Sequence, residues 1–211
     1  MTDAFITAEK LMQTGAVQLS LEQPYTWASG WKSPIYCDNR KVLSHPFVRE
    51  YIKSELSNAV FEKFRDAELI AGVATAGIAW GALIADQLKL PFIYVRPKPK
   101  EHGLGNQIEG DFTAGQRTVV IEDLISTGKS SLQVVEVLKN NGLEIDGMVS
   151  IFNYRFEAAA TAFEEAKIEV FSLTDYPALL EVAGKRGMIQ AAQQEVLLKW
   201  RQDPANWTGV Q

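Results

Sequence analysis

Two adjacent carboxylates, Glu122 and Asp123, follow an apolar run and precede a short stretch of small and hydroxylic residues. The run at 118–121 predicts a buried strand, and the pattern over about 130–140 predicts a helix. Backbone N–H groups in the first turn of a helix lack partners within the helix and carry partial positive charge, so they can hold an anion. Residues 126–130 therefore predict a phosphate-binding loop beside two acids.

Three hydroxyl side chains and a glycine favour this interpretation, because hydroxyls can donate to phosphate and a glycine lets the backbone approach it closely. They are Ser126, Thr127, Ser130 and Gly128. The triplet that starts at Gly128 resembles the end of a nucleoside-triphosphate P-loop, but that motif requires a glycine where Asp123 stands. A carboxylate there would repel the phosphates, which excludes a P-loop. An N-capped helix with acids on the surface is the alternative interpretation.

Four basic side chains occupy every second position after a second apolar run at 92–95. They are Arg96, Lys98, Lys100 and His102. The intervening prolines disfavour helical geometry, and in an extended chain this spacing places all four side chains on one side. Such a row suits a polyanion such as pyrophosphate, and the glycines that follow predict a lid that opens and closes. A solvated surface loop without function is the alternative.

The rest of the chain alternates between strand and helix patterns. Apolar runs predict strands at 69–73, 92–95, 118–121, 147–152 and 168–173. Helices are expected at 3–14, at 47–64, from the turn at 75–77 to about 88, at 130–140, after the fourth strand, and at about 189–200. Continuous apolar strands that alternate with helices indicate an α/β fold with a mostly parallel sheet. Ligands of such sheets bind beyond the carboxyl ends of the strands, here the loops 74–77, 97–111 and 122–130.

Composition limits the class of protein. Of the 211 residues, 46% are hydrophobic and 22% are charged, which argues against disorder and predicts one domain. The net charge of −5 disfavours a nucleic-acid-binding surface. The longest uncharged stretch, 69–85, is too short for a membrane span, and no secretory signal is recognisable. Because the lone Cys37 fits a reducing compartment, we expect a cytoplasmic protein that binds neither membranes nor nucleic acid.

Three segments resemble the orotate phosphoribosyltransferases, which belong to the type I phosphoribosyltransferase family. The strand, acid pair and loop at 118–131 resemble the ribose-phosphate signature of that family. The segment 96–110 is similar to the catalytic loop of the orotate enzymes, with its arginine, lysines and His-Gly ending. Residues 25–39 resemble their amino-terminal Ser-Gly-x-x-Ser-Pro segment.

The resemblance implies the type I phosphoribosyltransferase fold, a central mostly parallel sheet flanked by helices with a small amino-terminal hood. It implies a single domain over 1–211, with the hood and base pocket in about 1–45 and the α/β core in about 46–200. It also implies a homodimer in which the 96–110 loop reaches the partner's site. The implied reaction is the Mg2+-dependent transfer of phosphoribosyl from phosphoribosyl pyrophosphate (PRPP) to orotate. Its products are orotidine 5′-phosphate and pyrophosphate, in pyrimidine (UMP) biosynthesis.

The resemblance also implies roles for individual residues. PRPP would be bound by Arg96, Lys100, His102, Glu122, Asp123, Leu124, Ile125, Ser126, Thr127, Gly128, Lys129 and Ser130. Orotate would contact Ser126, Arg155, Tyr36 and Cys37. The catalytic residues would be Arg96, Lys98, Lys100, His102 and Asp123. Mg2+ would be held mainly by PRPP, so no direct metal ligand of the protein is assigned.

Three positions depart from the pattern of many relatives. Pro97 stands where many have a lysine, and Lys98 would supply that charge. Ala28 and Ala76 stand where some have a lysine, so backbone N–H groups at 74–77 would serve pyrophosphate instead. A phosphoribosyltransferase for another base, and a non-catalytic regulator that binds PRPP or a nucleotide, are the alternatives.

Overall fold

The computed structural model describes residues 3–27, 29–98 and 107–209, so Ala28, Lys100 and His102 lie outside the described residues. The helices are α1 (Ala4–Gln13), the 3-10 helix η1 (Asn39–Ser44), α2 (Pro46–Lys63), α3 (Ala76–Leu88), α4 (Lys129–Asn140), α5 (Glu157–Glu165), α6 (Tyr176–Lys185) and α7 (Ala191–Gln202). The strands are β1 (Val17–Leu19), β2 (Tyr25–Thr26), β3 (Lys32–Ser33), β4 (Ile35–Cys37), β5 (Leu69–Val73), β6 (Phe92–Val95), β7 (Ile108–Glu109), β8 (Arg117–Ile125), β9 (Glu144–Asn153) and β10 (Val170–Asp175). Within these ranges, no helix combines the length and the apolar character that crossing a bilayer requires.

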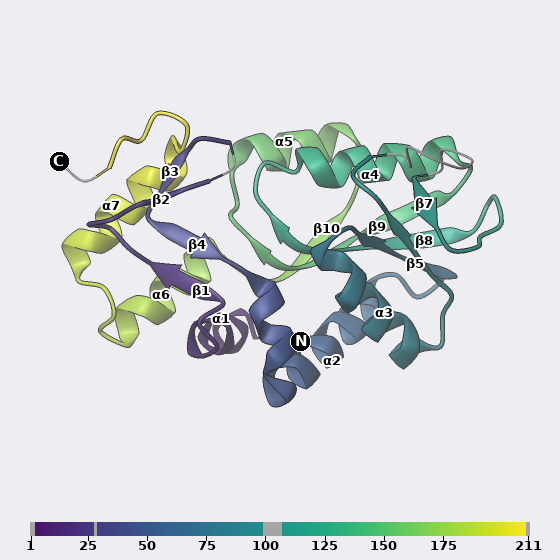
Figure 1. The fold of residues 1–211 in the computed structure, drawn as a ribbon, viewed down its shortest axis with the longest axis horizontal. Helices are drawn as coiled ribbons and strands as arrows, with labels where there is room; N and C mark the ends of the chain where they lie inside the picture. Colours follow the sequence, from purple (N-terminus) through teal and green to yellow (C-terminus); the bar gives the residue numbers. More distant parts are fainter. Residues whose placement is uncertain (1–2, 28, 99–106, 210–211) are drawn as a thin grey trace.

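A six-stranded sheet forms the centre of the fold, in the order β10-β9-β8-β5-β6-β7 (Figure 1). The first five strands are parallel to their neighbours, whereas β7 pairs antiparallel with β6. From β5 the chain passes through α3 to β6 on one side, and it returns to β8 on the other side of β5. Where the connections diverge in this way, a parallel sheet has a crevice at the carboxyl ends of the two strands, here β5 and β8.

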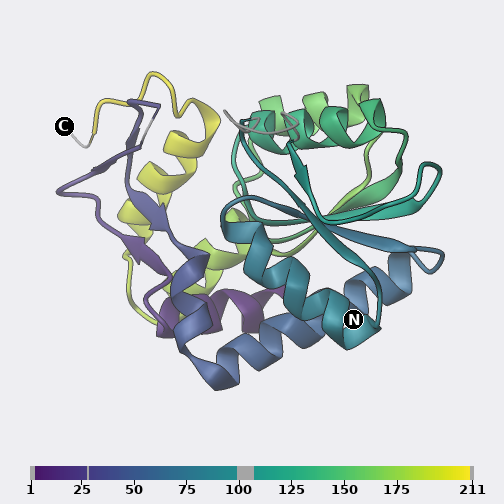
Figure 2. The same ribbon diagram turned by 45° about the vertical axis from the view of Figure 1, so that its right-hand side comes forward.

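Helices cover both faces of the sheet: α4 and α5 lie on one face, and α1, α2 and α3 lie on the other (Figure 2). In β5, Leu69, Ala71 and Val73 belong to the core beneath α4 and α5, and Ile70 belongs to the opposite core. This alternation follows from the two-residue period of a strand. All of β5 is buried, as expected for a parallel strand covered on both faces. The predicted α/β class with a mostly parallel sheet is confirmed.

A small hood, made of β1–β4 and η1, stands beside the sheet. β1 pairs antiparallel with β4, and β2 pairs antiparallel with β3. The carboxyl-terminal α7 packs against the hood, where the buried Trp200 donates from Nε1 to the carbonyl of Lys32 at 3.0 Å. The rings of Trp27, Tyr154 and Trp200 lie in mutual contact, with centroids 5.0, 5.8 and 5.9 Å apart. An aromatic cluster therefore joins the hood, the end of β9 and α7.

Two elements differ from the sequence predictions. The strand predicted over 118–121 continues to Ile125, because β9 pairs with β8 as far as Ile125 and Asn153. The acid pair therefore lies within the strand rather than after it. The pattern predicts no element over α6, whose side chains Leu179 and Leu180 are buried together with most of the helix. Its exposed side is narrow and consists of Pro177, Glu181 and Lys185, so few polar residues mark the helical period.

Two glycines bring the first turn of α3 against β5 and β8. A Cβ atom at Gly77 would lie 2.5 Å from the carbonyl oxygen of Ile121, and one at Gly72 would lie 2.7 Å from the carbonyl oxygen of Gly77. Carbon and backbone oxygen do not approach so closely, so any larger residue would displace the helix. These glycines therefore set the width of the crevice between the β5–α3 turn and the end of β8.

We expect Gly77→Ala to destabilise the protein by roughly 1–3 kcal/mol, because α3 must move away from β8. Gly184→Ala is the matched control: its Cβ would meet its nearest neighbour, Gln194 Oε1, at an ordinary 3.5 Å within α6. That change should be neutral or stabilise the helix by up to about 1 kcal/mol. Chemical denaturation measures both free energies of unfolding, and equal effects of the two changes would contradict the close approach.

Candidate active site

A cavity of about 400 Å3 lies at the diverging point of the sheet, at the carboxyl ends of β5 and β8. Three parts of the chain form it: the end of the hood, the β5–α3 turn, and the β8–α4 segment. Its lining residues are Cys37, Asp38, Arg40, Val73, Ala74, Thr75, Ala76, Glu122, Asp123, Leu124, Ser126 and Ser130. The structure thus brings together the acid pair, the turn at 74–77 and part of the predicted phosphate loop.

The two carboxylates of the acid pair have different surroundings. Glu122 is only 5% exposed; its Oε2 accepts from Ser131 Oγ at 2.9 Å and its Oε1 accepts from the N–H of Asp123 at 3.1 Å. Burial raises the pKa of Glu122 well above the usual range, and the neighbouring Asp123 carboxylate raises it further. Burial also raises the pKa of Asp123, which is partly exposed to the cavity. The pair therefore favours binding at least one proton, or a ligand that compensates its charge.

The predicted phosphate loop leads from β8 into the first turn of α4. Gly128 is the N-cap and has φ of 75°, a conformation that favours glycine, and a Cβ there would lie 2.7 Å from the ring of Phe163. Ser130 and Lys129 are exposed, and Ser130 lines the cavity with Ser126. The first-turn N–H groups of α4 lack intrahelical partners by geometry and can donate to an anion.

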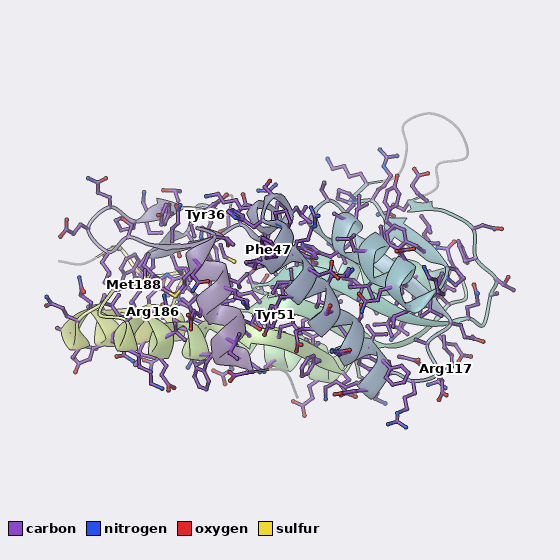
Figure 3. The ribbon with its side chains drawn as sticks, turned by 90° about the horizontal axis from the view of Figure 1, so that it is seen from below. Tyr36, Phe47, Tyr51, Arg117, Arg186 and Met188 are labelled. Atoms are coloured by element: carbon purple, nitrogen blue, oxygen red, sulfur yellow. The ribbon has the colours of Figure 1, made fainter. Side chains whose placement is uncertain are left out.

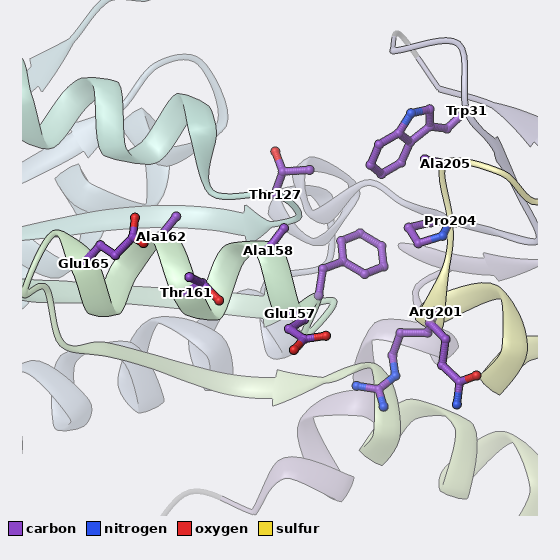
Figure 4. A pocket seen from close by; sticks show the side chains of 12 residues that line it. Trp31, Thr127, Glu157, Ala158, Thr161, Ala162, Glu165, Arg201, Pro204 and Ala205 are labelled. Carbon is purple, nitrogen blue, oxygen red and sulfur yellow. The ribbon is translucent and has the colours of Figure 1, made fainter.

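Not every loop residue can act through its side chain. Ile125 is fully buried in the core beneath α4 and α5, so only its backbone is available to a ligand. Thr127 does not line the cavity at the acid pair. It lines a larger cavity of about 540 Å3 between α5 and the carboxyl-terminal segment, together with Trp31 and Arg201 (Figure 4).

Another cavity, of about 350 Å3, adjoins the cavity at the acid pair and shares Cys37, Leu124 and Ser126 with it. We call it the base cavity, because residues predicted to contact the base line it. Its other lining residues are Thr26, Trp27, Tyr36 and Tyr154. The structure thus brings together Tyr36, Cys37 and Ser126, three of the four residues predicted to contact the base. Burial raises the pKa of the Cys37 thiol, and the carboxylates of Asp123 and Asp38 raise it further, so the thiol stays protonated. Three aromatic side chains and a thiol suit a flat heterocycle.

Arg155, the fourth predicted base contact, lies elsewhere. Its φ is 58°, and its Nε forms an ion pair with Asp175 Oδ2 at 3.0 Å. It lines a different cavity with Asn153, whereas its neighbour Tyr154 lines the base cavity. The structure therefore does not bring Arg155 together with Tyr36, Cys37 and Ser126.

The predicted cationic loop begins and ends at paired strands. The N–H of Arg96 donates to the carbonyl of Gln107 at 2.9 Å, and Gln107 Nε2 donates to the carbonyl of Arg96 at 3.1 Å. Arg96 Nη1 lies 3.8 Å from Glu109 Oε1, and Lys98 is exposed. Neither cation lines the two cavities among the residues that the structure describes. The positions of Lys100 and His102 lie outside the described residues.

Among the residues without a predicted role at the site are three consecutive hood residues beside the acid pair, Asp38, Asn39 and Arg40. Asn39 is fully buried; its Nδ2 donates to the carbonyl of Asp123 at 2.7 Å, and its Oδ1 accepts from Cys37 Sγ at 3.4 Å. It therefore ties the hood to the acid pair. Asp38 and Arg40 line the cavity. The available signal was their position directly after Cys37, the last residue assigned to the base pocket.

Comparison with known proteins identifies the family to which the chain belongs. Residues 45–175 match the family model of the phosphoribosyl transferase domain. The chain is 54% identical to an orotate phosphoribosyltransferase of Phocaeicola vulgatus over 95% of its own length and 94% of that relative. It is 52% identical to an orotate phosphoribosyltransferase of Bacillus cereus over 94% and 95% of the two chains. The chain belongs to the orotate phosphoribosyltransferase family.

Solved structures agree with this membership. The orotate phosphoribosyltransferase of Aeropyrum pernix superposes with a TM-score of 0.74 and 29% identity, over 87% of this chain and 99% of the other. The UMP synthase of Leishmania donovani gives a TM-score of 0.79 at 24% identity, over 94% of this chain and 42% of the other, which is a likeness of fold. The resemblance predicted from the three segments, and the type I phosphoribosyltransferase fold it implied, are confirmed.

The raised pKa of Glu122 should make the free energy of unfolding depend on pH. In the unfolded chain its carboxyl ionises from about pH 4.5 upward, whereas in the folded chain its raised pKa keeps it protonated to higher pH. Its stabilising contribution is thus complete below about pH 4.5 and is lost as pH rises through the folded pKa. Relative to Glu122→Gln, the wild type should therefore lose free energy of unfolding as pH rises.

Urea denaturation of both proteins at several pH values from 4 to 8 measures this difference. Glu62→Gln, on the exposed surface of α2, controls for the removal of one charge. A difference between wild type and Glu122→Gln that stays constant over the whole range would contradict the raised pKa.

Proposed function

We propose that this chain transfers 5-phosphoribosyl from PRPP to orotate, forming orotidine 5′-phosphate and pyrophosphate in pyrimidine (UMP) biosynthesis. One observation carries the proposal beyond family membership. The cavity at the acid pair and the aromatic base cavity meet at Ser126, the first residue of the phosphate loop. A ribose 5-phosphate held at the loop and the acid pair would therefore present its anomeric carbon toward a base in the adjoining cavity.

The sugar and its phosphate would be held by β8 and the residues that follow it. The first-turn N–H groups of α4 and the hydroxyl of Ser130 would bind the 5-phosphate. The carboxylates of Glu122 and Asp123 would accept hydrogen bonds from the ribose hydroxyls. Leu124, Ile125, Ser126, Thr127, Gly128 and Lys129 complete the proposed PRPP contacts, with Ile125 acting through its backbone.

Orotate would lie between Tyr36, Cys37 and Tyr154, with Ser126 donating to it. Its carboxylate needs a cation, and Arg155 is the proposed partner because guanidinium binds carboxylate in bidentate fashion. In that role the side chain of Arg155 would leave Asp175 and turn toward the base cavity. Orotate already carries an ionisable ring nitrogen, so no nucleophile from the protein is required.

The chemical difficulty is the departure of pyrophosphate from the anomeric carbon, which builds positive charge on the ribose and negative charge on the leaving group. Arg96, Lys98, Lys100 and His102 would stabilise the departing anion. The ionised carboxylate of Asp123 would favour the cationic ring. Closure of the 96–110 loop would exclude water, whose attack would waste the donor.

Mg2+ is proposed as the cofactor. No group of three or more potential ligand side chains that could enclose a metal ion exists within 3–27, 29–98 and 107–209. Because Asp123 offers a cavity-lining carboxylate, the residues fit an ion held mainly by oxygens of PRPP with Asp123 as the protein's contribution. Bound there, Mg2+ would supply positive charge to the pyrophosphate oxygens.

We propose a cytoplasmic homodimer in which the 96–110 loop reaches the partner's site. Large apolar side chains are exposed on the face formed by α1, α2 and the hood, among them Phe47 at the start of α2, 92% exposed, and Tyr36 of β4 (Figure 3). Phe5, Ile6, Phe61 and Met188 are further exposed apolar side chains. Burying such residues against a second copy would remove apolar area from water. The net charge of −5 supports small-molecule substrates rather than nucleic acid.

The deciding experiment follows orotate absorbance after PRPP and Mg2+ are added to the protein, together with the release of pyrophosphate. We expect orotate to be consumed and pyrophosphate to be released in equal amounts, and neither change when Mg2+ is omitted. Adenine, hypoxanthine and uracil replace orotate in parallel reactions. Pyrophosphate release with one of those bases alone would assign another transferase, and PRPP binding without release would assign a regulator.

Lys100→Ala should lower kcat by roughly 10²-fold or more, because the transition state loses a charge partner for the leaving group. Lys139→Ala removes an exposed lysine from the last turn of α4, at the end of that helix away from the phosphate loop, and should leave kcat unchanged. Steady-state kinetics with saturating PRPP and orotate measures both. A near-normal kcat for Lys100→Ala would remove this lysine from the mechanism.

A further inference from the structure

The cavity at the end of β8 carries an unbalanced charge. Three carboxylates line it, those of Asp38, Glu122 and Asp123. Among its lining residues, Arg40 is the one cationic side chain. A donor that carries a phosphate and a pyrophosphate would meet strong repulsion here unless cations compensate the carboxylates. The charge and position of Arg40 therefore bear on how such a donor is held.

The position of Arg40 is set by the residue two places before it. Asp38 is the N-cap of η1, and its Oδ1 accepts both from the backbone N–H of Arg40 at 3.2 Å and from its Nε at 2.7 Å. Of the guanidinium nitrogens, only Nε takes part in these two contacts. Within the part of the chain that the structure describes, Asp38 is the one acidic partner of Arg40. The Arg40 side chain is 58% exposed, so Nη1 and Nη2 remain accessible to a ligand.

Arg40 is also coupled to the acid pair. Its positive charge acts against the burial that raises the pKa of Asp123, which places the guanidinium within electrostatic reach of that carboxylate. The adjacent Asn39 is bonded to the carbonyl of Asp123 at 2.7 Å, so η1 and the end of β8 are held together. The Asn39 bond thereby holds η1 at the end of β8, and the contact of Nε with Asp38 holds the guanidinium at the cavity.

The remaining wall of the cavity suits the pyrophosphate end of the donor. In the proposed function, the 5-phosphate of the donor occupies the phosphate loop. The β5–α3 turn forms another polar wall, with small side chains at Ala74 and Ala76 and the first-turn N–H groups of a 13-residue helix. This wall offers no side-chain cation of its own. Arg40 lines the same cavity and can supply one.

We propose that Arg40 binds the pyrophosphate group of the donor through Nη1 and Nη2, with Asp38 positioning it. This rests on the proposed function, and it names a substrate-binding residue on the hood rather than on the sheet or the 96–110 loop. Arginine suits this task because its planar fork donates two parallel hydrogen bonds to phosphate oxygens. The hood would then contact both the base and the leaving group.

Titration calorimetry with Mg2+ present tests this, with PRPP, inorganic pyrophosphate and orotidine 5′-phosphate as separate ligands. Arg40→Ala should weaken binding of PRPP and pyrophosphate by about 10-fold to 100-fold, as expected for the loss of a charged hydrogen-bond pair. Binding of orotidine 5′-phosphate, which has no pyrophosphate, should change less than threefold. Arg40→Lys keeps the charge without the fork and should fall between wild type and Arg40→Ala.

Arg65→Ala, in the exposed turn after α2, is the matched control and should bind all three ligands as the wild type does. Equal weakening of all three ligands by Arg40→Ala would overturn the proposal, and so would unchanged PRPP binding or a wild type that does not bind pyrophosphate. Failure of the proposed function would instead appear in the wild type alone, as absence of pyrophosphate release from PRPP and orotate.

Discussion

The pairing of β8 with β5 as far as Ile121, and with β9 as far as Ile125, is the constraint on which the site depends. β5 and β9 flank this strand, and β9 pairs with it as far as Ile125. The pairing with β9 therefore holds the backbone of Glu122 and Asp123 in the sheet. Burying adjacent carboxyls costs free energy, which the contacts from Ser131 and the Asp123 N–H to Glu122 partly offset. Hydroxyl groups of PRPP and a cation would offset the rest of this cost. The buried acid pair therefore favours the binding of such a ligand.

The second organising contact joins the hood to that strand. Asn39 connects Cys37 of the base cavity with the backbone of Asp123. The two cavities also share Leu124 and Ser126, which belong to the β8–α4 segment. The proposed positions of the base and the sugar therefore share lining residues rather than lying in separate cavities. A displacement of the hood would change both at once, which suits a reaction in which attacking and leaving groups must align on one carbon.

Local patterns predicted the α/β sheet, the acid pair and the phosphate loop, because apolar runs and the helix-start signal depend on neighbouring residues. Family resemblance supplied the base-pocket residues Tyr36 and Cys37. The extension of β8 to Ile125 could not be read locally, since it depends on pairing with β9. The helix α6 exposes only the narrow side formed by Pro177, Glu181 and Lys185, so its period is weakly marked in the sequence. Arg40 enters the cavity only because η1 folds back onto β8, a contact between residues 84 positions apart for Asn39 and Asp123.

The aromatic cluster between the hood and α7 has an optical consequence. Trp27 lines the base cavity, contacts Tyr154 at a centroid distance of 5.0 Å, and stacks near Trp31 at 6.4 Å. A flat heterocycle entering that cavity would lie against the indole, displacing water from it and offering an acceptor for its excited state. The intrinsic fluorescence of Trp27 should therefore report whether the base cavity is occupied, without any added label.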